Sequence, residues 1–425
     1  MRIIPSKNTV SSLVIPGSKS LSNRYLLLAA TAKGVSKISG LLKSNDTDVC
    51  LSVLRTLGIT IQESSEAMII QGCDKNFPVK EAKLHLGQAG TVARFLPGLL
   101  AASENSGKYE LTASEQLSKR PIAALLSALQ TVGADIIGDR LPFEVKGSGI
   151  YGGEVFISGK ETSQFFSGLM LSAPLWQNNS TIHLQDANLE EENYIQMTLN
   201  TMKNFGVSVE TEGMTFKVSP QKYRAANLSV EADANTAGYF FALAALHGTT
   251  MNVPNLSLNS IQPGVKFLNV LERMGATVTA ENGITVKGPT HLKGDFIIDM
   301  KPMAEMALTL GVMAAFADAP ITMTNLAHIR HHESDRLAVL SENLSALGVN
   351  HMMKQDGIAI HPSPLKRYSP ALIHTYDDHR VAMSFALFGT MAEGITIENP
   401  SCVSKTCPSF FDLLGKAGIQ MENAL

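Results

Sequence analysis

The stretch LRTLGITI, residues 54–61, joins a helix-like apolar run to a strand-like β-branched run through Gly58. The pattern returns five more times, as LQTVGADI (129–136), MKNFGVSV (202–209), LERMGATV (271–278), LSALGVNH (344–351) and LGKAGIQM (414–421). Successive glycines are 75, 73, 69, 73 and 70 residues apart. A helix commonly ends on a residue with positive φ, a conformation that glycine adopts without steric strain. The sequence therefore predicts six copies of one α/β unit.

A second strand-like segment follows most of these glycines before the next turn. Examples are AMIIQG ending at Gly72, PFEVKG ending at Gly147 and GITVKG ending at Gly288. Each unit is therefore predicted to carry a β-hairpin after its helix. Three units precede the segment 230–235 and three follow it, which predicts two similar lobes. We expect one lobe of residues 1–18 plus 234–425 and another of residues 19–233, with a cleft between the lobes for a small anionic ligand.

The composition of the 425-residue chain is that of a folded protein without a general affinity for nucleic acid. Hydrophobic residues make up 44% and charged residues 17%, and the formal net charge is −3. A chain of this length exceeds one ordinary core, and a slightly negative charge provides no basic field. Anion binding must therefore come from local motifs.

The four cysteines form no CxxC pair and have no histidine at zinc-ligand spacing; they are Cys50, Cys73, Cys402 and Cys407. They are typical of a reduced, cytoplasmic protein. The first ten residues lack the apolar core of a signal peptide, and the most apolar stretch, residues 307–316, is too short to cross a membrane. We expect a cytoplasmic protein with no bound metal and no membrane partner.

The first motif with chemical content is PGSKSLSNR, residues 16–24. Pro-Gly turns the chain, so that Lys19 and the neighbouring hydroxyl groups fall at a helix start, where free N–H groups and the helix dipole favour an anion. Ser20 and Arg24 are four residues apart and share a helix face. The glycine spacing is not that of a Walker A loop. Taken alone, the stretch also fits an N-capped helix with solvated charges.

Three further motifs of the N-terminal half combine small residues, hydroxyl groups or cations. They are GQAGT (87–91), in which Gly90 permits close backbone approach, KRP (119–121) with Arg120, and TSQ (162–164) before an apolar helix. An arginine suits bidentate recognition of a carboxylate or phosphate. Taken singly, the alternatives are a simple turn, a surface arginine and an N-cap at Thr162.

The C-terminal half contains HIRHHESDR, residues 328–336. A helix over this stretch would group His332, Glu333 and Arg336. The residue order does not fit the HExxH pattern of a zinc site. An exposed helix with ion pairs is the alternative.

Two last motifs, YDDHR (376–380) and SKT (404–406), each place one cation beside hydroxyl or acidic groups. These cations are Arg380 and Lys405, so both predicted lobes carry cationic motifs. A cleft lined by them would bind a compact polyanionic metabolite without a metal ion.

In this order, PGSKSLSNR, GQAGT, KRPI, TSQF, HHESDR, YDDHR and SKTCP resemble the 5-enolpyruvylshikimate-3-phosphate (EPSP) synthase family over nearly the whole chain. The resemblance implies two lobes, each of three α/β units in an inverse α/β barrel. It implies a transferase of the shikimate pathway that moves the enolpyruvyl group of phosphoenolpyruvate to the 5-hydroxyl of shikimate 3-phosphate, in chorismate and aromatic amino acid biosynthesis. No cofactor is implied, a cytoplasmic monomer is expected, and the family is the target of glyphosate, to which we expect this chain to be sensitive.

The resemblance also implies roles for residues at the matching positions. The catalytic residues are Glu305 as the base, Glu333, and Lys19, which contacts both substrates. Shikimate 3-phosphate binding is implied for Ser20, Arg24, Thr162, Ser163 and Gln164. Phosphoenolpyruvate binding is implied for Gly90, Arg120, His332, Arg336, Arg380 and Lys405.

Several positions depart from the commonest family pattern. Many members have Asp at Glu305, Lys at His332, and Asn at both His328 and Gln88, and a short Ser-containing stretch replaces the acidic residues 190–192. A histidine in place of a lysine makes the contact sensitive to pH. We interpret the set as a branch variant that keeps the activity.

Two other functions are weighed against this one. The related UDP-N-acetylglucosamine enolpyruvyl transferases usually carry a reactive Cys before the Arg-Pro pair, and residues 105–120 contain none. A non-catalytic anion-binding paralogue would have lost charged site residues, whereas Glu305, Glu333 and the cations remain.

Overall fold

The computed structural model describes residues 1–423 except 8, 65 and 186–191. The chain divides into two compact units, unit 1 with Met1–Pro16 and Glu231–Leu425, and unit 2 with Gly17–Val230. Each unit is described by itself below. The lobe boundaries at residues 18 and 233 and the cleft stay predictions.

The described part of unit 2 contains three four-stranded sheets. Their strand orders are β13 (Asn227–Ser229), β2 (Lys33–Ser39), β4 (Ala67–Cys73), β3 (Thr60–Glu63); β5 (Glu81–His85), β6 (Lys108–Thr112), β8 (Phe143–Lys146), β7 (Asp135–Ile137); and β9 (Glu154–Ser158), β10 (Ser180–Gln185), β12 (Thr215–Val218), β11 (Glu210–Glu212). In each sheet the first pair is parallel and the next two pairs are antiparallel.

Unit 1 repeats this arrangement. Its sheets are β14 (Thr250–Val253), β16 (Ile284–Lys287), β15 (Thr277–Thr279); β17 (Phe296–Asp299), β18 (Ile321–Thr324), β20 (Gly357–His361), β19 (Asn350–Lys354); and β21 (Ala371–Ile373), β22 (Ile395–Ile397), β1 (Arg2–Ile4), β23 (Gln420–Glu422). In the three-stranded sheet, a parallel bridge from Ser12 to Asn252 occupies the place of the missing first strand. The prediction of six copies of one α/β unit is confirmed.

The helices of unit 2 are α1 (Lys19–Thr31), α2 (Asn45–Thr56), α3 (Gly90–Ala102), α4 (Glu115–Ser118), α5 (Ala123–Thr131), α6 (Ser163–Ser172), the 3-10 turn η1 (Ala173–Leu175) and α7 (Glu192–Asn204). Helix α3 contacts both α1 and α6 and is buried along its whole length. Because every residue of α3 is buried and only Thr91 and Arg94 among them are polar, the helix suits a position enclosed by other elements.

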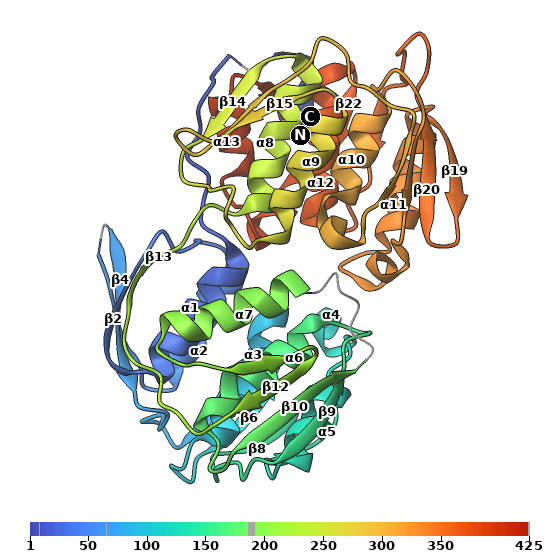
Figure 1. Ribbon diagram of the computed structural model, residues 1–425. Helices are drawn as coiled ribbons and strands as arrows, with labels where there is room; N and C mark the ends of the chain where they lie inside the picture. The colour runs from blue at the N-terminus through green and yellow to red at the C-terminus, as the bar shows by residue number, and fades with distance from the viewer. Residues whose placement is uncertain (8, 65, 186–191, 424–425) are drawn as a thin grey trace. The chain divides into compact units, whose positions relative to one another are not determined.

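The helices of unit 1 are α8 (Ala234–His247), η3 (Pro263–Lys266), α9 (Phe267–Arg273), η4 (Lys301–Met306), α10 (Ala307–Ala314), η5 (Ala327–His331), α11 (Arg336–Ala346), α12 (His379–Met391), η6 (Pro400–Lys405) and α13 (Phe410–Lys416). Helices α8, α10 and α12 contact one another, and Figure 1 shows them side by side with strands outside them. Side chains along a strand alternate between buried and exposed, which fits helices on one face of a sheet and solvent on the other. In β9 of unit 2, Val155 and Ile157 are buried, whereas Glu154 and Phe156 are exposed.

The six helix-ending glycines all have positive φ, between 74° and 100°. They are Gly58, Gly133, Gly206, Gly275, Gly348 and Gly418, and they follow α2, α5, α7, α9, α11 and α13. The predicted reason for glycine at these positions is confirmed.

The other helix of several units begins at a chemical motif. Helix α1 begins at Lys19, α3 at Gly90 and α6 at Ser163, and Asp378 caps α12. The fold therefore places the motifs at helix N-termini, where backbone N–H groups are unpaired. None of the described helices is both long and apolar enough to cross a membrane.

Candidate functional site

Lys19 forms an ion pair with Asp46 in unit 2. Its Nζ lies 3.2 Å from Asp46 Oδ2, and the side chains are 21% and 4% exposed. Asp46 lies in the first turn of α2, which begins with a capping box between Ser44 and Thr47. The buried carboxylate holds the ammonium group at the start of α1, with part of that group open to solvent.

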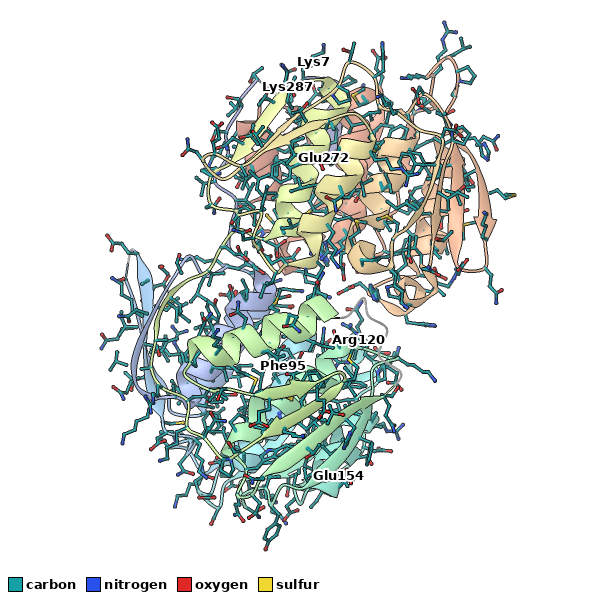
Figure 2. The ribbon with its side chains drawn as sticks, in the orientation of Figure 1. Lys7, Phe95, Arg120, Glu154, Glu272 and Lys287 are labelled. Atoms are coloured by element: carbon teal, nitrogen blue, oxygen red, sulfur yellow. The ribbon has the colours of Figure 1, made fainter. Side chains whose placement is uncertain are left out.

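Arg24 is buried, and its hydrogen bonds to described residues all go to neutral oxygen atoms. Its Nε donates to Thr198 Oγ1 (3.1 Å), Nη1 to Ser20 O (3.0 Å) and Nη2 to Ser167 Oγ (3.2 Å). The guanidinium lies 4.8 Å from the ring centroid of Phe95, which Figure 2 labels. Burial lowers the pKa of Arg24 to about 10. Arg24 therefore holds Ser20 and two hydroxyl groups in place.

Gly90 lies against two guanidinium groups. Arg94 donates from Nη1 to Gly90 O (3.1 Å) and from Nη2 to Pro121 O (2.9 Å). A Cβ atom on Gly90 would lie 3.1 Å from Arg94 Nη1 and 3.2 Å from Arg120 Nη1. Burial, and then the charge of Arg120, lower the pKa of Arg94 to about 9. Two neighbouring cations without a described carboxylate partner favour an anion.

Arg94 was not among the predicted site residues. Its Nε is buried without a hydrogen-bond partner among the described residues. A buried N–H group normally has a partner, and an anion or a water molecule would supply one here. Helix α5 begins at Ala123, two residues after Pro121. The sequence signal for Arg94 was its position four residues after Gly90 on one helix face.

Thr162 caps α6, as the sequence alone favoured. Its Oγ1 accepts a hydrogen bond from Gln164 N (3.2 Å). Ser163 is buried and Gln164 is half-buried at the first positions of the helix. The backbone N–H groups of this first turn and the Gln164 amide are of the type that hydrogen-bonds a phosphate or a ring hydroxyl.

Arg336 is the centre of the charged cluster in unit 1, and all five of its N–H groups have partners. Its Nε and Nη2 donate to Asp378, at 2.8 and 3.3 Å, and Nη2 also donates to Glu333 Oε2 (2.9 Å). Nη1 donates to Glu305 Oε2 and to His332 Nδ1, both at 2.9 Å. The guanidinium offers five donors, so an added anion must displace one of these partners.

Two further cations contact the same carboxylates. Lys405 Nζ donates to Glu333 Oε1 (2.9 Å), and Arg380 forms an ion pair with Glu305 through Oε2. Arg380 Nη1 also donates to the hydroxyl of Tyr239 (3.4 Å). The two cations are 10% and 11% exposed, while Arg336 is 2% exposed. All three cations are therefore largely buried, and the Glu305 side chain, at 25%, is more exposed than any of them.

Two carboxylates of this cluster, Glu305 and Asp378, are ionised. Burial alone raises the pKa of Glu305, but the charges of Arg380 and Arg336 outweigh burial and hold that pKa well below its ordinary value. Burial also raises the pKa of Asp378, but the charges of Arg336 and His379, with the hydrogen bond from Arg336, together lower it below its ordinary value. The pKa of Arg336 is raised by Asp378, Glu305 and Glu333 against the effect of burial.

His332 is neutral at pH 7. Burial, and then the charge of Arg336, lower its pKa to about 4, although Glu305 and Glu333 raise it in part. Since Nδ1 accepts from Arg336, the ring proton is on Nε2. The ring of His328 lies edge-on at 5.8 Å between centroids. His332 therefore offers a neutral donor where many family members have a cation.

No single helix spans residues 328–336, although a helix was the arrangement that would have grouped His332, Glu333 and Arg336. Residues 327–331 form η5, and α11 begins only at Arg336, because Asp335 caps it by accepting from Ala338 N (3.0 Å). The predicted grouping is nevertheless present, since Arg336 contacts both His332 and Glu333. Ser334-Asp335 before an apolar run was the cap signal.

Asp46 and Asp378 are the site carboxylates that sequence reasoning missed. Asp378 was quoted within YDDHR but given no role, and it is 0% exposed with Ser334 Oγ and Arg380 N also donating to it. Residues 190 and 191 lie outside the described residues, as does the side chain of residue 192. Among the described residues, no cluster of three or more His, Cys, Asp or Glu is arranged to hold a metal ion.

The model of the family EPSP synthase (3-phosphoshikimate 1-carboxyvinyltransferase) matches residues 4–414 of the chain. The chain belongs to this family. It is 43% identical over 420 residues to 3-phosphoshikimate 1-carboxyvinyltransferase 2 of Halalkalibacterium halodurans, covering 97% of this chain and 92% of that protein. It is 37% identical over 434 residues to the chloroplastic 3-phosphoshikimate 1-carboxyvinyltransferase 1 of Nicotiana tabacum, covering 96% and 83%.

A solved family structure has the same fold. The EPSP synthase of Acinetobacter baumannii matches with a TM-score of 0.85 and 26% sequence identity, covering 99% of this chain and 98% of that one. The predicted α/β class and the predicted family are confirmed.

Proposed function

We propose that the chain transfers the enolpyruvyl group of phosphoenolpyruvate to the 5-hydroxyl of shikimate 3-phosphate and releases phosphate. The observation that carries the proposal is the Arg336 cluster, in which one buried guanidinium holds Glu305, Glu333 and Asp378 beside two further cations. Ionised carboxylates beside donors for an anion are what an addition to an enol phosphate requires.

Phosphoenolpyruvate is the ligand assigned to the cations of unit 1. Arg336, Arg380 and Lys405 each pair with a carboxylate, and we assign the phosphate and carboxylate of phosphoenolpyruvate to these cations in place of those partners. Exchange of one anion for another keeps the guanidinium groups neutralised. In unit 2, the guanidinium groups of Arg94 and Arg120 lie beside Gly90.

Shikimate 3-phosphate is the ligand assigned to unit 2. Ser20, with Arg24 holding its carbonyl, and the TSQ segment at the start of α6 supply hydroxyl, amide and backbone N–H donors. Lys19 is fixed by Asp46 and is assigned contact with both substrates.

In the reaction, the 5-hydroxyl oxygen bonds to the enol carbon while the methylene gains a proton. The C–O bond to phosphate then breaks and the methyl group loses a proton, which restores the double bond. Glu305 is assigned as the base for the hydroxyl, and Glu333 and Lys19 are assigned to the other proton transfers. In the free protein Glu305 is a weak base because two arginines lower its pKa; an anionic donor on these arginines raises that pKa toward neutrality.

Phosphate release measures the proposal directly. We expect release only when both phosphoenolpyruvate and shikimate 3-phosphate are present, with equimolar 5-enolpyruvylshikimate 3-phosphate found by mass. Release with UDP-N-acetylglucosamine as the acceptor would favour the sister activity, and binding of the donor without any release would favour a non-catalytic paralogue. The cytoplasmic location and the monomeric state stay predictions.

A further inference from the structure

Two residues with left-handed backbone directly precede Asp378. Tyr376 has φ 51° and Asp377 has φ 55°. Residues with side chains adopt this conformation rarely, and it persists where the surrounding contacts hold it. Asp378 and Arg380, which follow at once, contact Arg336 and Glu305. The position of this turn therefore sets the position of the Arg336 cluster.

Two side-chain contacts hold the turn. The Tyr376 hydroxyl donates to the Glu342 carboxylate, at 2.7 Å from Oε2 and 2.9 Å from Oε1. Asp377 Oδ1 accepts from Asn399 Nδ2 at 2.7 Å. The second contact reaches a different element, because Asn399 immediately precedes η6.

Asn399 uses both ends of its amide. Its Oδ1 accepts from Ser401 N (3.2 Å) and Ser401 Oγ (2.6 Å) and so caps η6, while Nδ2 donates to Asp377. The orientation of the amide is unambiguous, because a backbone N–H only donates and an ionised carboxylate only accepts. One side chain thus joins the start of η6 to the turn before α12.

Together with other contacts of unit 1, these hydrogen bonds form a closed path that includes cations assigned to phosphoenolpyruvate. Lys405, in the last turn of η6, reaches Glu333, Glu333 reaches Arg336, and Arg336 reaches Asp378. Asp377 immediately precedes Asp378, and its hydrogen bond with Asn399 leads back to the start of η6. Helix α12 also packs against η6, but on this path the Asn399–Asp377 hydrogen bond is the link that does not run through the carboxylates assigned to be displaced by phosphoenolpyruvate.

We propose that Asn399 is a positioning residue, whose hydrogen bond to Asp377 fixes Lys405 relative to Arg380 and thereby sets the affinity for the anionic donor. The inference rests on the proposed function. It predicts that the contact acts on the donor KM, because the cations it positions bind the donor, and leaves the KM for shikimate 3-phosphate unchanged.

The test exchanges the hydrogen-bond donor, Asn399, and the hydrogen-bond acceptor, Asp377, and measures the KM for phosphoenolpyruvate. Asn399→Asp keeps an oxygen to cap η6 but sets a second carboxylate against Asp377. We expect the donor KM to rise about fivefold, with kcat changed less than twofold. In the double variant Asn399→Asp with Asp377→Asn, the amide and carboxylate exchange places, and we expect the donor KM to return to within about twofold of wild type. Asp377→Asn alone completes the cycle.

Two controls separate positioning from a general loss of structure. Asn350→Asp adds the same charge on the exposed strand β19, and we expect its kinetics to match those of wild type. The Asn399→Asp effect, relative to wild type at the same salt concentration, should shrink as ionic strength rises, since it arises from repulsion between exposed charges.

An unchanged donor KM in Asn399→Asp, or a raised KM that the double variant does not restore, would overturn the inference while the proposed function stands. Parallel changes in kcat and both KM values, with a lowered Tm, would also overturn it and assign Asn399 a structural role. Absence of phosphate release by the wild-type protein would instead remove the proposed function.

Discussion

Glu305 and Arg336 are joined by a hydrogen bond of 2.9 Å between Oε2 and Nη1, and the same carboxylate oxygen also pairs with Arg380. The proposed base therefore occupies the donors that the substrate anion needs. Under the proposed function, we expect phosphoenolpyruvate to displace Glu305 from these arginines as it binds, so that the arrival of the donor also frees the base.

Glu305→Gln removes the base but keeps a side chain of the same size. We expect kcat to fall by about 10²- to 10⁴-fold, with the donor KM equal to or below that of wild type, because the competing carboxylate charge is gone. Initial rates of phosphate release measure both. Glu305→Asp should retain turnover within about tenfold, since a carboxylate base remains. Glu281→Gln, on the surface of unit 1, is the matched control. Full turnover by Glu305→Gln would refute the assignment of the base.

His332 predicts a pH dependence of stability. Its folded pKa of about 4 lies below the ordinary value of 6.5, so the unfolded chain binds more protons between these values. The contribution of the neutral ring to the free energy of unfolding is complete above pH 6.5 and is lost as the pH falls toward 4. We expect a loss on the order of 2 to 3 kcal/mol from this group.

Urea unfolding at pH 7 and at pH 4.5 measures this loss. The comparison is with His332→Gln, whose amide still accepts from Arg336 but does not titrate. Other acidic groups titrate in both proteins, so the difference isolates the imidazole. Identical pH dependence in the two proteins would contradict the low pKa of His332.

Gly90→Ala places a methyl group 3.1 to 3.2 Å from Arg94 and Arg120. These guanidinium groups must move, so we expect the KM for phosphoenolpyruvate to rise by roughly three- to tenfold with little change in the KM for shikimate 3-phosphate.

Glyphosate should lower the activity of the wild-type protein at limiting phosphoenolpyruvate, and it should lower the activity of Gly90→Ala less. An initial rate of wild type that excess glyphosate leaves unaffected would contradict the expected sensitivity. The control is Ser127→Ala, on α5. A second glycine such as Gly213 does not serve, because its φ is positive and alanine would strain the backbone there.

Removal of divalent ions tests the expectation of a metal-free reaction. We expect phosphate release to continue at an unchanged rate after dialysis against a chelator, because guanidinium and ammonium groups are assigned the task of neutralising phosphate charge. Activity that disappears with chelator and returns with added Mg²⁺ would show that a metal takes part.

The repeat was predictable because its signal is local. Eight residues suffice to recognise an apolar helical run that ends in a glycine and continues as a strand. Gly58 and its five counterparts all have the expected positive φ. The strand order was not predictable in the same way. β1 pairs with β22 and β23, nearly the whole chain away, and no local pattern specifies that partner.

The site was predictable at its cations and less so at its carboxylates. Lys19 and Arg336 lie in recognisable motifs, whereas Asp46 and Asp378 gain their meaning from partners 27 and 42 residues away. Spacing along a helix cannot show such pairs. No single helix spans residues 328–336, because the cap at Asp335 competes locally with helix formation.

The pairing of β1 has a consequence for synthesis of the protein. Ile3 lies between Ile395 and Met421, so the first strand has no partners until the last part of the chain leaves the ribosome. Unit 2 is complete once β13 has emerged, and we expect it to fold first. At ordinary rates of translation, synthesis of the 195 residues from 231 to 425 takes roughly 10 to 40 s, during which β1 has no partner strands. During that interval the folded unit 2 tethers an unpaired strand at one end and a growing chain at the other.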